Sequence, residues 1–146
     1  MHRTVRAALG AAVLLASAGP AASEGAFAVG STGDVVGKGM AFGWSYNYAS
    51  KGEAIEAAMR TCRESGASDA SAQCMVIATY RNECLAVAID PQQGTPGAGW
   101  AIHADRATAE QRALDSCRAT AGPDRRDACR LEEIECDSRG QTVAAL

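Results

Sequence analysis

The chain has 146 residues, 47% of them hydrophobic, with 14 basic and 17 acidic residues and a formal net charge of −3. This length is sufficient for one domain with a modest core. An acidic domain has no electrostatic footprint for nucleic acid or for an anionic lipid surface, so we expect neither as a partner.

Residues 1–23 have the pattern of a secretory signal peptide. Two arginines precede an apolar stretch at 7–18, and small residues then supply a cleavage site after Ala22 or Ser23. The stretch is shorter than the roughly 20 residues of a bilayer span, so we expect cleavage, with an uncleaved anchor as the alternative. Loss of the two arginines leaves 12 basic and 17 acidic residues, a net charge of −5. No later stretch has the composition of a membrane helix, and we expect an exported, soluble monomer in the periplasm or the medium.

The mature chain begins with residues that favour β-strands. A short apolar run at 26–29 predicts the first strand, and glycine, serine and aspartate at 30–34 predict a turn. Residues 38–48 then place Met, Phe, Trp and Tyr at every second position, with Gly, Ala or Ser between them. This alternation predicts a strand with one bulky face and one small face, and we expect the small face to lie under a helix.

A helix follows this strand. Ser50 and Glu53 form a Ser-x-x-Glu capping box, and apolar residues recur at helical spacing as far as Cys62. The polar segment 64–73 predicts a loop, and the apolar segment 75–80 predicts a strand that ends in a turn.

The rest of the chain repeats this order of elements. We predict a strand at 85–89, a loop at 90–99, a strand at 100–103, a helix from Asp105 to Ala119, a loop at 122–127 and a strand at 130–135. The last strand is unusual because it contains three glutamates, Glu132, Glu133 and Glu135, where the first copy is apolar. We expect disorder after Asp137.

Six cysteines in an exported domain of this size predict three disulfides. Cys62 and Cys74 have the same separation as Cys117 and Cys129, and the second pair lies 55 residues after the first. We therefore expect each of these pairs to form a disulfide. The predicted pairs are Cys62–Cys74, Cys117–Cys129 and, by remainder, Cys84–Cys136. No two cysteines have the two-residue spacing of a redox or zinc motif, so we expect neither metal binding nor thiol catalysis.

Together these elements predict an α+β domain of two ββαβ repeats. The single domain would span 24–138, with halves at about 24–83 and 84–138, and residues 139–146 would form a flexible tail. We expect a mainly antiparallel sheet of about six strands with both helices on one face, because that arrangement buries both apolar helix stripes.

The order of the motifs also resembles a known family. The strand Gly43-Trp44-Ser45-Tyr46-Asn47-Tyr48 leads into Ser50-x-x-Glu-Ala and Cys62; Cys74, an apolar strand and Arg81-Asn82-Glu83-Cys84 follow. Gly-Trp and Ala-Glu-x-x-Ala-Leu-x-x-Cys then recur between Gly99 and Cys117. Over nearly all of the mature chain, the sequence is similar to a bacterial secreted family known as domain of unknown function 4189. The resemblance implies an exported, disulfide-bonded domain and brings no established activity. The glutamates of the last strand depart from the family pattern.

A hydrolytic set could be assembled only around His103, with Ser45 or Asp105. The residues around Ser45 resemble a nucleophile elbow, but Asn47 stands where the motif has glycine, and the segment is a strand. We therefore expect no catalytic residues, with His103 at a strand end and Asp105 as a helix cap. A small secreted hydrolase remains the alternative.

The candidate binding residues are Trp44, Tyr46, Trp100 and His103. Aromatic side chains grouped on two equivalent strands are common anchors at interfaces, although they could equally form the core. The acidic cluster of Glu132, Glu133, Glu135 and Asp137 could bind a hard cation or a basic partner surface, but we favour an edge strand charged against aggregation. We expect a non-enzymatic exported domain without cofactor or metal, which binds a protein or envelope component through the aromatic face and the 90–99 loop. A structural envelope domain without a ligand is a further alternative.

Overall fold

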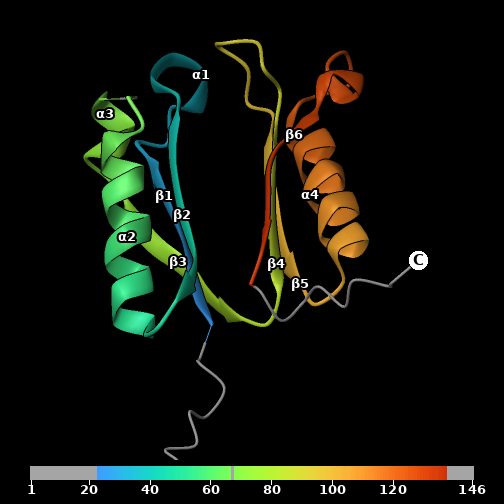
Figure 1. Cartoon of the computed structure of the whole chain (residues 1–146). Coiled ribbons are helices and arrows are strands. Elements are labelled where there is room, and N and C mark those ends of the chain that lie inside the picture. Colours follow the sequence, from blue (N-terminus) through green and yellow to red (C-terminus); the bar gives the residue numbers. More distant parts are fainter. Residues whose placement is uncertain (1–22, 67, 138–146) are drawn as a thin grey trace, which may run out of the picture.

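The computed structural model describes residues 23–66 and 68–137 (Figure 1). Each half of this part of the chain contains three strands and one long helix. The first half contains β1 (Glu24–Ser31), α1 (Val35–Lys38), β2 (Met40–Tyr48), α2 (Lys51–Glu64), α3 (Ser68–Ser71) and β3 (Met75–Arg81). The second contains β4 (Cys84–Ile89), β5 (Ala98–His103), α4 (Arg106–Thr120), a 3-10 turn (Arg126–Ala128) and β6 (Arg130–Cys136). The predicted signal peptide up to residue 22 and the predicted tail lie outside the described residues.

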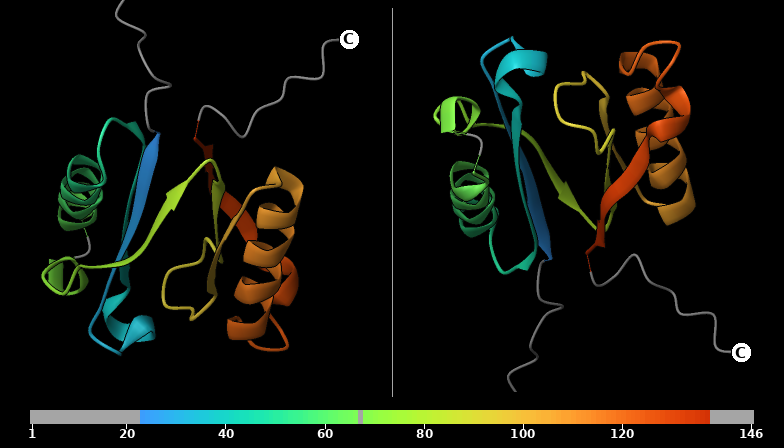
Figure 2. Two further views of the ribbon diagram at one scale, coloured as in Figure 1. Left: turned by 90° about the horizontal axis from the view of Figure 1, so that it is seen from below. Right: turned by 90° about the horizontal axis from the view of Figure 1, so that it is seen from above.

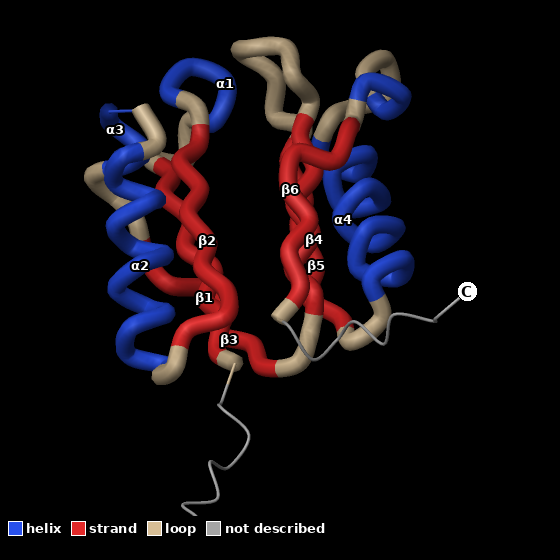
Figure 3. Tube along the Cα trace, in the orientation of Figure 1, coloured by secondary structure: helices blue, strands red, loops and turns tan. Residues whose placement is uncertain are grey.

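The strands form two antiparallel sheets of three, in the orders β2-β1-β3 and β5-β4-β6. The sheets face each other, and α2 and α4 cover their outer faces, giving the layers helix, sheet, sheet and helix (Figures 1 and 3). The α+β class, the two ββαβ halves, the antiparallel pairing and the three disulfides agree with the sequence prediction. The arrangement of layers differs, because each half closes its own sheet and the two helices lie on opposite sides of the domain.

Small residues on the outer face of each sheet let the helix approach closely. Gly43 of β2 and Gly99 of β5 are buried, and a Cβ atom at either position would collide with the backbone of the helix above it. The helix backbones concerned are those of Ala58 and Cys62 in α2 and of Ala113 and Cys117 in α4. The prediction that the small strand face lies under a helix is therefore confirmed.

The bulky faces explain why the sheets pair. Phe27, Tyr80, Leu85 and Val87 are buried between them and come from both halves. Phe27 stacks on Phe42 of its own sheet, with ring centroids 6.2 Å apart, and contacts Trp100 of the other sheet at 5.4 Å. A single open sheet would leave this second apolar face in water, whereas face-to-face packing buries it.

The disulfides join the pairs that the cysteine spacing predicted. Cys62–Cys74 connects the end of α2 to the residue before β3, and Cys117–Cys129 connects α4 to the residue before β6. Cys84–Cys136 joins register partners on β4 and β6. Cys62–Cys74 and Cys117–Cys129 occupy equivalent positions in the two halves, and each connects a helix covalently to its own sheet.

The helix caps are also as predicted. Ser50 Oγ accepts the Glu53 amide at 3.3 Å and donates to the Glu53 carboxylate at 2.9 Å. Asp105 accepts the Thr108 amide at 2.7 Å. The acidic strand β6 pairs with β4 from Cys84↔Cys136 to Ile89↔Arg130, so its glutamates do not prevent strand formation. The two short helices α1 and α3 were not predicted; Asp34 begins α1 by accepting the Gly37 amide at 2.8 Å.

Candidate functional site: a cleft between the two halves

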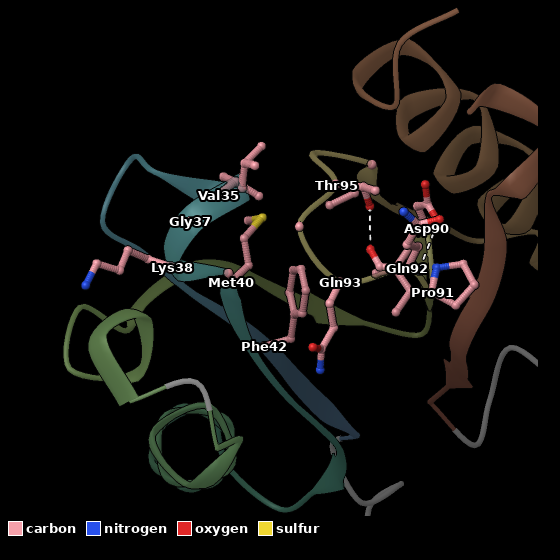
Figure 4. A pocket seen from close by; sticks show the side chains of 16 residues that line it. Val35, Gly37, Lys38, Met40, Phe42, Asp90, Pro91, Gln92, Gln93 and Thr95 are labelled. Carbon is pink, nitrogen blue, oxygen red and sulfur yellow. Dashed lines mark hydrogen bonds between the residues drawn. The ribbon is translucent and has the colours of Figure 1, made fainter. Parts of the chain in front are cut away.

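A cleft of about 440 Å³ lies at one end of the junction between the two halves. One wall is α1 with the start of β2, and the other wall is the 90–97 loop that joins β4 to β5 (Figure 4). The views from the two ends place α1 and this loop at the same end of the domain (Figure 2). The cleft therefore has one wall from each half, and its volume lies in the range of roughly 300–1,000 Å³ of known ligand pockets.

Hydrogen bonds and an ion pair on the side away from the cleft fix the conformation of the 90–97 loop. The Asp90 side chain is fully buried and forms two hydrogen bonds with Arg125, at 2.7 Å to Nε and 2.6 Å to Nη2. It also accepts the Gln92 amide at 3.0 Å, and the Asp90 amide donates to Gly97 O at 2.9 Å. The hydrogen bonds from Arg125 lower the pKa of Asp90 to about 2, so the carboxylate stays charged at neutral pH. Thr95 donates to Gln92 O at 2.7 Å and closes the turn.

The opposite wall is held from the outside. Lys38, the last residue of α1, forms an ion pair of 2.7 Å with Asp69 of α3, and this side chain points away from the cleft in Figure 4. Asp69 raises the pKa of Lys38 through this contact. Met40 and Phe42 of β2 instead point toward the 90–97 loop. The wall thus turns its charge outward and its apolar side chains inward.

The other end of the domain is closed by Asp137. Its side chain is fully buried and accepts the amides of Asn82 at 3.0 Å and Asn47 at 3.4 Å. Asn47 and Asn82 have positive φ angles of 61° and 57°, a conformation that asparagine tolerates better than most residues. Burial raises the pKa of Asp137, while the two amide hydrogen bonds act in the opposite direction. Asp137 follows β6, so these bonds connect the end of the second half to β2 of the first half and to the turn between β3 and β4.

The predicted aromatic residues lie between the sheets and away from the cleft. Trp44 is half-buried, while Tyr46 and Trp100 remain 38% and 39% exposed. Trp44 and Tyr46 line a separate shallow depression along the end of β2, and Trp100 packs on Phe27. Trp44 thus packs against the inter-sheet core and Trp100 contacts it, while Tyr46 and Trp100 keep exposed surface, so a binding role for these residues stays a prediction. The 90–99 loop is the part of the predicted contact face that lines the cleft.

Of the residues in the hydrolase alternative, Ser45 and His103 belong to different sheets, whereas His103 and Asp105 are neighbours. The Ser45 hydroxyl is buried under α2, where it donates to Ala54 O at 2.7 Å and accepts the Ala26 amide at 3.1 Å. His103 lies at the end of β5 in the other sheet, and its Nδ1 accepts the Asp105 amide at 3.0 Å. The Asp105 carboxylate caps α4, and its hydrogen bonds with Thr108 lower its pKa.

Two glutamates of β6 face the first half. Glu133 and Glu135 are register partners of Val87 and Leu85, whose side chains lie between the sheets. The charge of Glu135 is the main cause of a raised pKa at Tyr46, and burial raises the pKa of Glu133. Residues 23–66 and 68–137 contain no group of three or more histidine, cysteine, aspartate or glutamate side chains placed to hold a metal ion.

Sequence reasoning missed two features of this site. One is the wall formed by α1, because four residues are too few for a helical period. The other is Asp137, which has no pattern around it that points to burial. The Asp34-x-x-Gly37 spacing is a local capping signal that could have indicated a helical turn.

The structure is that of an α+β domain of two ββαβ halves, with three disulfides and a cleft at the junction of the halves. The chain belongs to the family described as Domain of unknown function (DUF4189), whose model matches residues 25–136. Neither the curated proteins nor the solved structures include a significant match to this chain. Within the described residues, no helix is long and apolar enough to cross a membrane.

Proposed function

We propose that the chain is an exported, non-enzymatic binding domain and that the cleft between α1 and the 90–97 loop holds its ligand. The observation that carries the proposal is the construction of the cleft. Its two walls come from different halves, and each has a charged contact outside the cleft, the exposed pair Lys38–Asp69 on one side and the buried Asp90 carboxylate with Arg125 on the other. Preformed walls reduce the entropic cost of binding a ligand.

Export is supported by the cysteines. All six are in disulfides, a pattern typical of oxidising compartments such as the periplasm and the medium. The predicted signal peptide at 1–23 is in agreement with this placement. The matching bridges, caps and close-contact glycines of the two halves further support an internal duplication of an ancestral ββαβ unit.

Export is tested by isolating the protein from periplasm and medium and measuring its intact mass with and without thiol alkylation. We expect a chain that starts near Ser23 and takes up no alkylating agent before reduction. A full-length chain with reactive thiols in the cytoplasm would overturn the export proposal.

Binding is tested by placing a photo-crosslinking amino acid at Gln93 in the cleft, with the same group at Met75 as a control on an exposed apolar side chain of β3, which lines no part of the cleft. On irradiation of the exported protein in its own envelope, we expect a discrete adduct from position 93 and none from position 75. Adducts from neither position, or from position 75 alone, would contradict the cleft as the binding site.

A further inference from the structure

We infer that the cleft takes an uncharged, extended peptide segment that carries an apolar side chain. The inference rests on the proposed function and specifies the ligand class for the same site. It follows from three properties of the lining: the absence of a free charge among its residues, an apolar floor, and a rim of amide and hydroxyl groups.

The first property is electrical neutrality. Lys38 and Asp90 are the charged residues of the described lining, and both are occupied elsewhere, by Asp69 and Arg125. Lys38 points away from the cleft, and the Asp90 side chain has no exposed surface (Figure 4). A charged ligand group would lose hydration in the cleft without gaining a counter-ion, which is strongly unfavourable. The lining therefore selects against phosphate, carboxylate and ammonium groups.

The second property is the apolar floor. Met40 and Phe42 are half-buried and point across the cleft (Figure 4), and Val35 and Ile89 are further apolar residues of its lining. Methionine adapts its shape to different apolar partners. Phe42 is the only aromatic residue of the lining, and it already stacks on Phe27. Aliphatic surface of this kind suits the apolar side chain of a peptide better than a sugar ring, which binds preferentially on open aromatic faces.

The third property is the polar rim on the 90–97 loop. Gln92 and Gln93 are exposed at the edge of the cleft, and each amide side chain carries two donors and an acceptor. A peptide backbone presents N–H and C=O groups in alternation, so it can pair with such amides without any charge. The Gln92 carbonyl accepts the Thr95 hydroxyl, and the two glutamine side chains offer further polar groups to a ligand.

The test uses the oxidised mature protein and capped pentapeptides Ac-Gly-Ser-X-Ser-Gly-NH2, in which X is Leu, Val, Phe, Asp or Lys. Binding is followed by NMR shifts of backbone amides. We expect shifts at 35–42 and 90–97 with Leu, Val and Phe, and affinities about tenfold or more weaker with Asp and Lys, because a charged side chain would be desolvated without a partner.

A charge placed on the wall sharpens the test. Val36 is 54% exposed, so Val36→Asp should fold normally while weakening the Leu peptide and strengthening the Lys peptide by about tenfold. Met75→Asp changes a comparably exposed residue outside the cleft and should alter neither affinity. No shift at 35–42 and 90–97 with any peptide, or equal binding of all five, would overturn the peptide inference.

The outcomes separate this inference from the proposed function. If chitotetraose shifts the cleft residues and the neutral peptides do not, the cleft is a binding site and the peptide class is wrong. If the crosslink at position 93 is absent in the envelope as well, the proposed function fails independently of the peptide result.

Discussion

The two halves of the domain share a framework and differ in their connections. Each has a capped helix on the outer face of its sheet, a buried glycine beneath that helix, and a disulfide between cysteines 12 residues apart. The first half inserts α1 between its first two strands, whereas the second has the 90–97 loop. These unlike connections form the two walls of the cleft, so the features that the halves share support the cleft and the features that differ line it.

The third strands also differ. Ala78 and Tyr80 of β3 correspond to Glu133 and Glu135 of β6, 55 residues later, and both pairs of positions face the other half. At these positions the first half contributes an alanine and a tyrosine to the junction, and the second half contributes two carboxylates. If β3 and β6 were alike, identical surfaces would face each other across the junction. Because they differ, the two halves have one defined orientation relative to each other.

Gly43→Ala and Gly99→Ala should each lower the free energy of unfolding by more than about 3 kcal/mol, because the new Cβ collides with helix backbone in both halves. The measurement is urea unfolding of oxidised protein. Gly52→Ala is the control, since nothing lies within 4 Å of a Cβ there, and it should stabilise α2 by up to about 1 kcal/mol. A neutral effect at only one of the two sites would show that the halves do not share this contact.

Removal of the disulfide within the first half and removal of the one within the second half should lower the free energy of unfolding by the same amount. Replacing Cys62 and Cys74 by serine, or Cys117 and Cys129, opens a loop of equal length and should cost about 3 kcal/mol in each case. Unfolding in denaturant of the two double variants, side by side, gives the comparison. A difference well above 1 kcal/mol would mean that one half retains more structure when unfolded.

Asp137→Ala should cost about 2 kcal/mol, because the amides of Asn47 and Asn82 would lose a buried acceptor. The loss should also increase hydrogen exchange at those two amides relative to the centre of β1. Asp124→Ala, at an exposed residue, is the control and should stay within about 0.5 kcal/mol of the original stability. Unchanged exchange at Asn47 and Asn82 would show that Asp137 does not fasten the halves together.

The two helix caps should differ in their response to pH. Ser50→Ala should cost about 1 kcal/mol at any pH. Asp105→Ala should have a comparable effect at pH 7, which shrinks as the pH falls below about 4. The sign follows from the lowered pKa of Asp105: its contribution is present above the unfolded-state pKa and is lost as the pH falls through the folded-state pKa. Thermal unfolding from pH 2 to 8 measures the loss of stability in each variant. If the two losses changed with pH in the same way, the charge of Asp105 would not contribute to its cap.

The smallest effect concerns the acidic strand. Glu133→Ala should raise stability at pH 7 by less than about 1 kcal/mol, and Ala78→Glu, its counterpart in the first half, should lower it. Burial raises the pKa of Glu133, so its unfavourable contribution is absent below the unfolded-state value of about 4.3 and grows as the pH rises through the folded-state pKa. The gain from Glu133→Ala should therefore vanish in acid. A gain that persists at pH 3 would indicate a cause other than ionisation.

The sequence by itself determined the local parts of this protein. Alternating bulky and small residues indicated β2, Ser50 and Asp105 marked the helix starts, and the cysteine spacing indicated the three bridges, because each of these signals acts over a few residues or is repeated. Only the tertiary structure decided that the bulky faces meet as two sheets, since alternation shows that a strand has two faces and does not show what covers each. It also decided the cleft and the position of Asp137, whose contact with Asn47 joins residues 90 positions apart. Contacts at such a distance leave no periodic trace in the chain, so they become visible only when the halves pack together.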